Sequence, residues 1–170
     1  FAALARAPEE GVLKLWEGLG YYNRARKLHQ LAQRLAGAGE LPSEVAFWLQ
    51  LPGVGPYTAA AITSIAFGAP ISCVDGNVVR VLARLTADDR AYPSGCAAAK
   101  AFQPLAGELL DPVAPGDYNQ AMMELGATVC TPRKPRCFEC PVQQFCQSAR
   151  LNIQEKLPVR VPPKKYYQSC

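Results

Sequence analysis

The stretch LPGVGPYTAAAI, residues 51–62, decides the fold because it joins two helices through a very short turn. It places two glycines and two prolines within five residues and then begins an alanine-rich run. Pro56 suits the first position of the second helix, since it lacks the N–H that would be unpaired there. Gly53 and Gly55 can adopt positive φ and leave their amides uncovered. The spacing therefore predicts a tight interhelical turn, with Tyr57 one residue into the second helix.

A turn of this kind can bind an anion. Backbone amides that converge at a helix N-terminus form an anion site, and a DNA phosphate is the natural candidate. Such a grip contacts the DNA backbone and carries no sequence information. The alternative is a plain connection between two helices with no ligand, and the turn by itself leaves both open. The candidate DNA-binding residues here are Leu51, Gly53, Val54 and Gly55.

Helical periodicity runs through nearly the whole chain, and no stretch has a convincing strand pattern. The predicted fold class is therefore all-α. A first helical stretch is ended by Gly18 and Gly20, and a later short helix follows Pro42 with Ser43 as its expected cap. This short helix spans residues 43–51. The other expected helices span residues 28–35, 56–67, the segment that starts near Asn77, 97–110 and 117–130.

Charge is unevenly distributed along the 170 residues, whose net charge is +4. Residues 130–170 contain eight Lys or Arg against two Glu, whereas the other 129 residues contain ten basic and twelve acidic side chains. A basic end indicates either a polyanionic partner or a solvated tail. No apolar run approaches the roughly 20 residues that cross a bilayer, and no signal peptide is present. We therefore expect a soluble intracellular protein without membrane contact. Because the chain begins at Phe1 rather than Met, we also expect it to be a fragment.

Four of the seven cysteines fall within 17 residues and have the spacing C-x6-C-x2-C-x5-C: Cys130, Cys137, Cys140 and Cys146. An odd, clustered set argues against a disulfide framework and for a metal site. Four thiolates without a nearby histidine suit zinc or a 4Fe–4S cluster. Zinc sites usually pair two short C-x2-C units, so this asymmetric string favours the cluster, with zinc as the alternative. Cys73 and Cys96 do not fit the spacing and are expected to be small core residues.

Several motifs in order resemble the helix-hairpin-helix DNA glycosylases that contain an iron–sulfur cluster. They are LPGVGPYTAAAI, VDGNVVRVL and the four-cysteine loop. WEGLGYYNRARKL and YNQAMMELGATVCTPRKPRCFECP are similar to the adenine glycosylases of the MutY type. The resemblance covers about residues 1–160. It implies two helical subdomains: 1–69 as a partial six-helix barrel that ends in the hairpin, and 70–150 with the cluster. Residues 151–170 are then a linker to a further domain.

The resemblance implies a monomeric base excision repair enzyme that hydrolyses the N-glycosidic bond of adenine opposite 8-oxoguanine or guanine in double-stranded DNA. It would act in the bacterial cytoplasm at the nucleoid, or in a nucleus. The endonuclease III branch has a Schiff-base lysine where Tyr57 stands, and a tyrosine cannot form an imine. The chain is therefore expected to be monofunctional. The alternatives are an endonuclease III-like glycosylase/lyase and a non-catalytic DNA-binding fragment.

Site residues carry over motif by motif. Asp75 matches the catalytic aspartate, Asn77 a residue that orients water and the sugar, and Tyr57 a tyrosine that supports the transition state. From the residues alone, Asp75 is expected to be the N-cap of the next helix, and capping can hold it in place. The general-acid glutamate of the family lies in a helix ahead of residue 1, and the domain that reads 8-oxoguanine follows the linker. The isolated chain is therefore expected to be inactive.

The DNA-facing residues carry over in the same way. Tyr21 matches the aromatic wedge that fills the gap beside a flipped base, and the alternative is that it covers a core helix. Arg24 and Arg26 follow on what should be the same surface as Tyr21. Arg133 and Lys134 supply positive charge on the cysteine loop. The chain departs from the family at Pro56, where an arginine is usual, which removes one phosphate contact.

Overall fold

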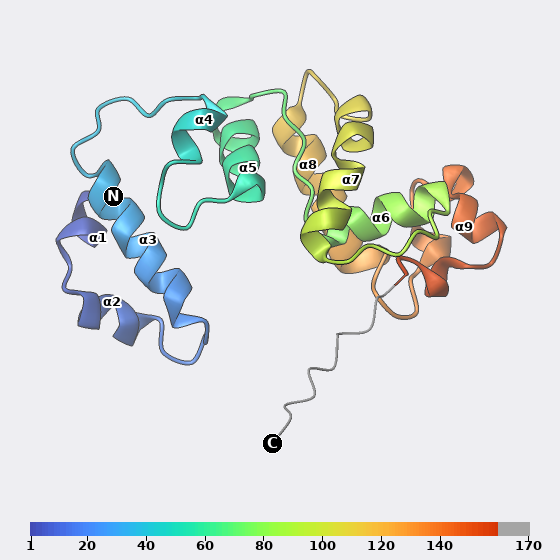
Figure 1. The fold of residues 1–170 in the computed structure, drawn as a ribbon, viewed down its shortest axis with the longest axis horizontal. Helices are drawn as coiled ribbons and strands as arrows, with labels where there is room; N and C mark the ends of the chain where they lie inside the picture. The colour runs from blue at the N-terminus through green and yellow to red at the C-terminus, as the bar shows by residue number, and fades with distance from the viewer. Residues whose placement is uncertain (160–170) are drawn as a thin grey trace. The chain divides into compact units, whose positions relative to one another are not determined.

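The structure is a computed structural model that describes residues 1–159. The expected linker beyond Val159, including Arg160, Lys164, Lys165 and Cys170, lies outside the described residues. Within residues 1–159 every regular element is helical, which confirms the predicted all-α class (Figure 1). The chain forms two compact units, Phe1–Thr63 and a second that begins at Ser64, and each is described by itself. No helix of this described part is long and apolar enough to cross a membrane.

The first unit is built around the hairpin. Trp48 and Val54 are buried in its core together with Leu35 and Ala59. The glycine turn lies between α4 (Val45–Trp48) and α5 (Pro56–Phe67), and both flank this core. The helices are α1 (Ala2–Arg6), α2 (Glu9–Leu15), α3 (Tyr22–Leu35), α4 (Val45–Trp48) and α5 (Pro56–Phe67), the last of which continues into the second unit.

Two helix boundaries in the first unit differ from expectation. The first helical stretch is two helices, because Ala7 adopts an extended ψ of 145° before Pro8, as proline disfavours a helical residue ahead of it. The helix after Pro42 has only four residues, and Glu44 rather than Ser43 stands at its N-cap, without a side-chain cap. The indole of Trp48 donates to the Pro42 carbonyl at 2.8 Å, which anchors the extended chain before this helix.

The second unit is centred on α6 (Gly76–Thr86), which packs against α7, α8, the π-helical turn η1 and α9. Its core combines residues of α6 and α7 with Val74 just ahead of α6. The other elements are α7 (Gly95–Glu108), α8 (Pro115–Glu124), η1 (Leu125–Val129), α9 (Gln147–Arg150) and the 3-10 turns η2 (Cys137–Glu139), η3 (Gln143–Phe145) and η4 (Gln154–Lys156).

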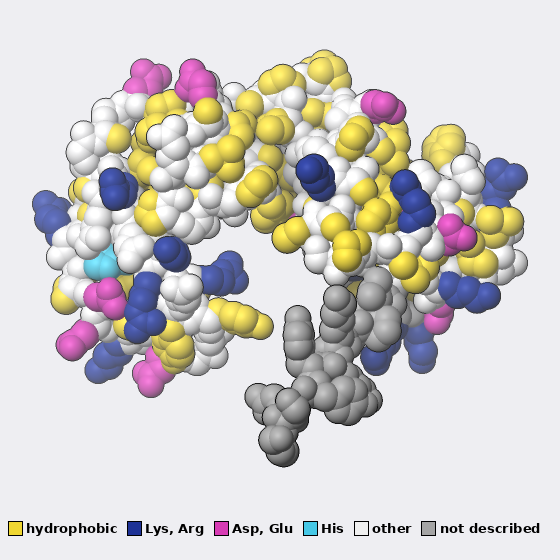
Figure 2. Space-filling model, in the orientation of Figure 1, with side chains coloured by type: hydrophobic (Ala, Val, Ile, Leu, Met, Phe, Trp, Pro, Cys, Tyr) yellow, Lys and Arg dark blue, Asp and Glu magenta, His cyan; other side chains and the backbone are white. Residues whose placement is uncertain are grey.

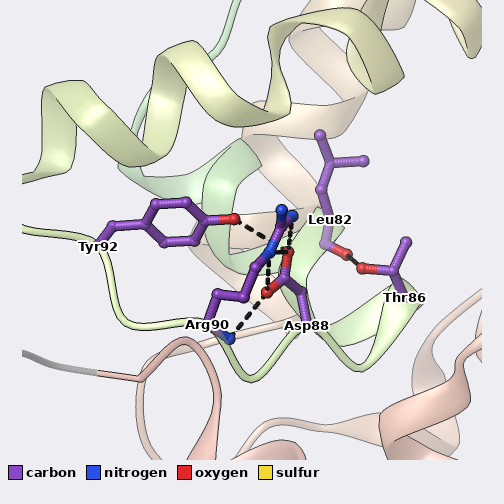
Figure 3. Close-up of polar contacts among 5 residues, drawn as sticks. All are labelled: Leu82, Thr86, Asp88, Arg90 and Tyr92. Carbon is purple, nitrogen blue, oxygen red and sulfur yellow. Dashed lines mark hydrogen bonds and ion pairs between the residues drawn. The ribbon is translucent and has the colours of Figure 1, made fainter.

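A polar cluster fixes the exit from α6. Figure 3 shows the Asp88 carboxylate between the Arg90 guanidinium and the Tyr92 hydroxyl. Arg90 Nε lies 3.0 Å from both carboxylate oxygens, and Tyr92 donates at 3.0 Å. The Asp88 side chain is only 8% exposed. Hydrogen bonding from Arg90 is the main reason that the pKa of Asp88 lies below its ordinary value.

Candidate active site and metal centre

The hairpin in the first unit is a tight turn, as predicted. Gly53 adopts φ +79°, whereas Gly55 does not need positive φ. The Gly55 carbonyl accepts the first helical hydrogen bond of α5, from Ala59 at 2.9 Å, and the Val54 amide donates to Leu51 at 3.2 Å. Gly53 is exposed and the side chain of Val54 is buried. Gly53 is thus the exposed point of the turn, and Val54 anchors the turn to the core.

Gly53 also lets α3 approach the hairpin. A Cβ built at Gly53 would lie 2.6 Å from Lys27 Cβ, closer than real Cβ contacts, and 3.2 Å from its Cγ. The stem of Lys27, which is an exposed residue, therefore runs directly over the turn. This contact joins the helix that follows Tyr21 to the glycine hairpin within one unit. Nothing in the sequence indicates this contact beyond the glycine itself.

Tyr21 lies outside the core, with 82% of its surface exposed. It stands at the N-cap of α3 in a left-handed conformation, φ +47°, and its carbonyl accepts from the Arg24 amide at 2.7 Å. Arg24 is exposed, whereas Arg26 forms an ion pair with Glu9 at 3.1 Å that ties α2 to α3. Tyr57 occupies the first turn of α5 and is 41% exposed. Each of these side chains reaches solvent from the first unit.

In the second unit Asp75 is the N-cap of α6, which confirms the capping role. Its Oδ1 accepts from the amides of Asn77 and Val78, each at 2.8 Å, and its Oδ2 accepts from Asn77 Nδ2 at 3.0 Å. The carboxylate is half-buried at the positive end of an 11-residue helix. Three donors hold it in one orientation while part of it remains open to solvent.

Arg80 links this aspartate to the cysteine loop. Its Nη2 donates to Asn77 Oδ1 at 2.8 Å and to the Gly126 carbonyl at 2.6 Å, and its Nε donates to the Cys130 carbonyl at 2.7 Å. Gly126 has no room for a side chain, because a Cβ there would lie 2.7 Å from Asn77 Cβ. Asp75 and the first cysteine are thus two side chains apart.

Arg84 is a second contact to the loop and is itself buried, with 2% of its surface exposed. Its guanidinium donates to the carbonyls of Leu157 at 3.0 Å and Thr131 at 2.8 Å, and to Cys130 Sγ at 3.3 Å. Our reading of the sequence missed both arginines. The available signal was their place in VVRVLARL, where two charged residues interrupt an otherwise apolar helix.

The side chains of Cys130, Cys137, Cys140 and Cys146 line one pocket together with Arg84. In residues 1–159 no three His, Cys, Asp or Glu side chains converge closely enough to hold a single ion. Burial raises the pKa of the Cys137 and Cys140 thiols, repulsion from neighbouring thiolates adds to this, and Arg84 opposes it at Cys137. Four thiols around a shared apolar space fit a cluster whose corner irons each take one thiolate.

Comparison with known families agrees with this geometry. Residues 1–104 match the HhH-GPD superfamily of base excision DNA repair proteins. The chain belongs to this superfamily. Residues 130–146 match the iron–sulfur binding domain of endonuclease III, which confirms the predicted iron–sulfur centre over the zinc alternative.

The similar proteins are longer than this chain. It is 49% identical over 140 residues to an adenine DNA glycosylase of Schizosaccharomyces pombe, covering 81% of this chain and 30% of that protein. It is 49% identical over 157 residues to the human adenine DNA glycosylase, covering 91% and 29%. The chain therefore spans about 30% of the length of these curated relatives.

Solved structures of the superfamily share the fold. A non-covalent endonuclease III–DNA complex superposes with a TM-score of 0.70 at 26% identity, covering 89% of this chain and 70% of that one. A thermostable thymine-DNA glycosylase also gives 0.70, at 32% identity, covering 87% and 69%. These matches confirm the helix-hairpin-helix glycosylase fold predicted from the motifs.

The remaining predicted residues are the basic pair of the cysteine loop and the two cysteines that do not fit the cluster spacing. Arg133 and Lys134 are exposed, and Figure 2 shows Lys and Arg side chains, in dark blue, gathered over the part of the second unit around α9. Lys134 adopts φ +49°, and Thr131 Oγ1 donates to the Arg133 carbonyl at 3.0 Å. Cys73 is buried, as expected, but Cys96 is exposed in the first turn of α7, so its assignment to the core was wrong.

Proposed function

We propose that this chain is part of a monofunctional adenine DNA glycosylase that removes adenine paired with 8-oxoguanine or guanine in double-stranded DNA. The observation that supports this most is its 49% identity to two proteins named adenine DNA glycosylase. Tyr57 adds to it, because the lysine of the lyase branch is absent at that position. The proposed place of action is the nucleoid or the nucleus, and the proposed form is a monomer.

The first unit supplies the proposed grip on DNA. The amides around Gly53 and Gly55 contact phosphate at the start of α5. Tyr21 enters the base stack and fills the space that a flipped adenine leaves. Arg24, and Arg133 and Lys134 of the cluster loop, neutralise further phosphates. In this proposal the iron–sulfur cluster is structural and holds the basic loop in shape, in a subdomain of residues 70–150 that follows the hairpin subdomain 1–69.

Asp75 supplies the proposed electrostatic part of the chemistry. As the bond between N9 of adenine and C1′ of the sugar breaks, positive charge develops on the sugar, and a nearby carboxylate stabilises it. Water then adds to C1′ and loses a proton. Asn77 holds one carboxylate oxygen at 3.0 Å and orients the water and the sugar. Tyr57 supports the same transition state. The departing adenine takes its proton from a glutamate that the family carries ahead of residue 1.

A substrate panel tests this proposal in the full-length protein that contains the chain. The duplexes carry A opposite 8-oxoguanine, A opposite G, T opposite G, or an abasic site, the last with borohydride. We expect adenine release from the first two, no thymine release, and no covalent adduct. Release of thymine, or a trapped adduct, would favour the endonuclease III-like glycosylase/lyase instead. Absence of any base release would favour a non-catalytic DNA-binding protein.

A further inference from the structure

Asn119 is a buried polar residue that no step of the proposed chemistry uses. It lies on α8 with 1% of its surface exposed, and all of its side-chain hydrogens are donated. Its Nδ2 donates to the Ile71 carbonyl at 2.8 Å and to Ser64 Oγ at 3.0 Å, and its Oδ1 accepts from the Cys73 amide at 2.9 Å. A carbonyl and an amide flank the side chain, so the orientation of its amide group is fixed.

The carboxamide of Asn119 pairs with the backbone of residues 71–73 as a neighbouring strand would. The Ile71 carbonyl and the Cys73 amide are the groups that residues i−1 and i+1 of an extended segment direct to one side. Residues 68–75 belong to no helix or strand, so these groups have no ladder partner. On Ser72, Gln103 of α7 donates to the carbonyl at 3.0 Å and to Oγ at 2.8 Å. The side-chain amides of Asn119 and Gln103 thus form the hydrogen bonds with residues 71–73 that a neighbouring strand would form in a sheet.

The segment that Asn119 holds, residues 71–73, ends two residues before the proposed catalytic Asp75. Cys73 is followed by Val74, which is buried in the core of the second unit, and then by Asp75. The Asp75 carboxylate is held from the other side by the first amides of α6. We propose that Asn119 is a positioning residue for Asp75: it fixes the backbone that leads into the aspartate, and so fixes where the negative charge stands. This inference rests on the proposed function.

The position of Asn119 is itself set by close packing of α8. A Cβ on Gly116, three residues earlier, would lie 2.7 Å from the Ser64 carbonyl oxygen and 2.9 Å from Ile65 Cα. Neither neighbour is the end of a flexible side chain, so α8 cannot shift toward the end of α5. This close packing holds α8 against the backbone at the end of α5, three residues before Asn119. An apolar residue at 119 could fill the same volume but would leave a buried carbonyl and a buried amide unpaired.

The test uses the full-length protein and three measurements: the single-turnover rate of adenine release, the affinity for a duplex with a non-cleavable adenosine analogue, and the thermal midpoint. In Asn119→Ala the segment is free to relax by an ångström or so. We expect the rate to fall about a hundredfold, as such misplacements do, while the affinity changes less than about threefold. A purely structural role would not separate rate from affinity in this way.

Leu105→Ala is the matched control, because it removes a partly buried side chain of α7 that packs against the apolar core containing Val74 and makes no hydrogen bond to residues 71–73. It should lower the thermal midpoint and leave the rate nearly unchanged. If Asn119→Ala slows release no more than this control, the positioning role is wrong. Should Asn119→Ala not fold, Asn119→Ser is judged by the same comparison. Asp75→Asn is measured in parallel. Full activity in that variant would overturn the proposed chemistry itself, whereas the Asn119 variants test only the positioning role.

Discussion

Gly53 combines two requirements that no other residue type meets. It takes φ +79°, and the stem of Lys27 fills the space where a side chain would stand. Positive φ alone disfavours other residues. The second requirement comes from Lys27 of α3, which lies 26 residues earlier in the sequence and was not visible in the turn motif. The two requirements together keep the turn and α3 in one arrangement.

Gly53→Ala should therefore destabilise the first unit by about 2 kcal/mol, from backbone strain and the displaced Lys27. Gly55→Ala is the matched control, since Gly55 has no positive φ and nothing within 4 Å of the added Cβ. Thermal unfolding of the two variants measures the difference. Equal midpoints would show that the contact between Lys27 and the turn does not constrain the protein.

Arg84 contributes both its charge and the planar shape of its guanidinium to the contact with the cysteine loop. Its planar fork donates to two carbonyls within 3.0 Å and to Cys130 Sγ at 3.3 Å. A lysine keeps the charge but cannot reach all of these acceptors. Arg84→Lys should lower the iron and sulfide content of the purified protein and its stability by roughly 3 kcal/mol. Arg90→Lys, at an exposed site, is the control. A normal iron content in Arg84→Lys would contradict this role.

At the scale of elements, α6 and η1 meet through a glycine. A Cβ on Gly126 would lie 2.7 Å from Asn77 Cβ and 3.0 Å from its carbonyl oxygen. Gly126→Ala should push η1 away from α6, cost about 2 kcal/mol of stability, and slow adenine release by moving Asn77. Gly107→Ala, inside α7 with only Ser72 Oγ at 4.0 Å, should be neutral or slightly stabilising. The same rate and midpoint in both variants would rule out this tight contact.

The connection between α6 and α7 carries a pH-dependent contribution. The pKa of Asp88 is lowered in the folded state, chiefly by hydrogen bonding from Arg90. Such a group stabilises the fold above its unfolded pKa, near 3.9, and the contribution is lost as pH falls through the folded pKa. Asp88→Asn should lose about 1 kcal/mol at pH 7. In urea unfolding, the gap to the parent protein should close below about pH 4, whereas a constant gap would contradict the linkage.

The elements show what the sequence could and could not predict. Helical periodicity, the proline-flanked turn and the cysteine spacing are local signals, so α5, the Asp75 cap and the cluster loop were predicted correctly. The division at Pro8 and the four-residue α4 were missed because short helices depend on packing. The contacts of Arg80, Arg84 and Asn119 join residues 46 to 73 positions apart. Such contacts follow from the tertiary fold and leave little trace in one sequence.

For the whole molecule, the proposed activity is divided between the two units. The first carries the hairpin, Tyr21 and Tyr57, and the second carries Asp75 and the cluster loop. The second unit connects its functional groups internally, since Asp75 bonds Asn77, and Arg80 bonds both Asn77 and the loop that begins at Cys130. A substitution at Asp75, Asn77 or Arg80 should therefore act within the second unit.

The rate of adenine release by full-length Asp75→Asn, measured in a single turnover on a duplex with A opposite 8-oxoguanine, tests the central claim most directly. The amide keeps one oxygen to cap α6 but removes the negative charge that we propose stabilises the sugar. We expect release to fall by a factor of about a thousand or more, with iron content and duplex affinity close to those of the parent protein. Release at the parental rate would contradict the assignment of Asp75.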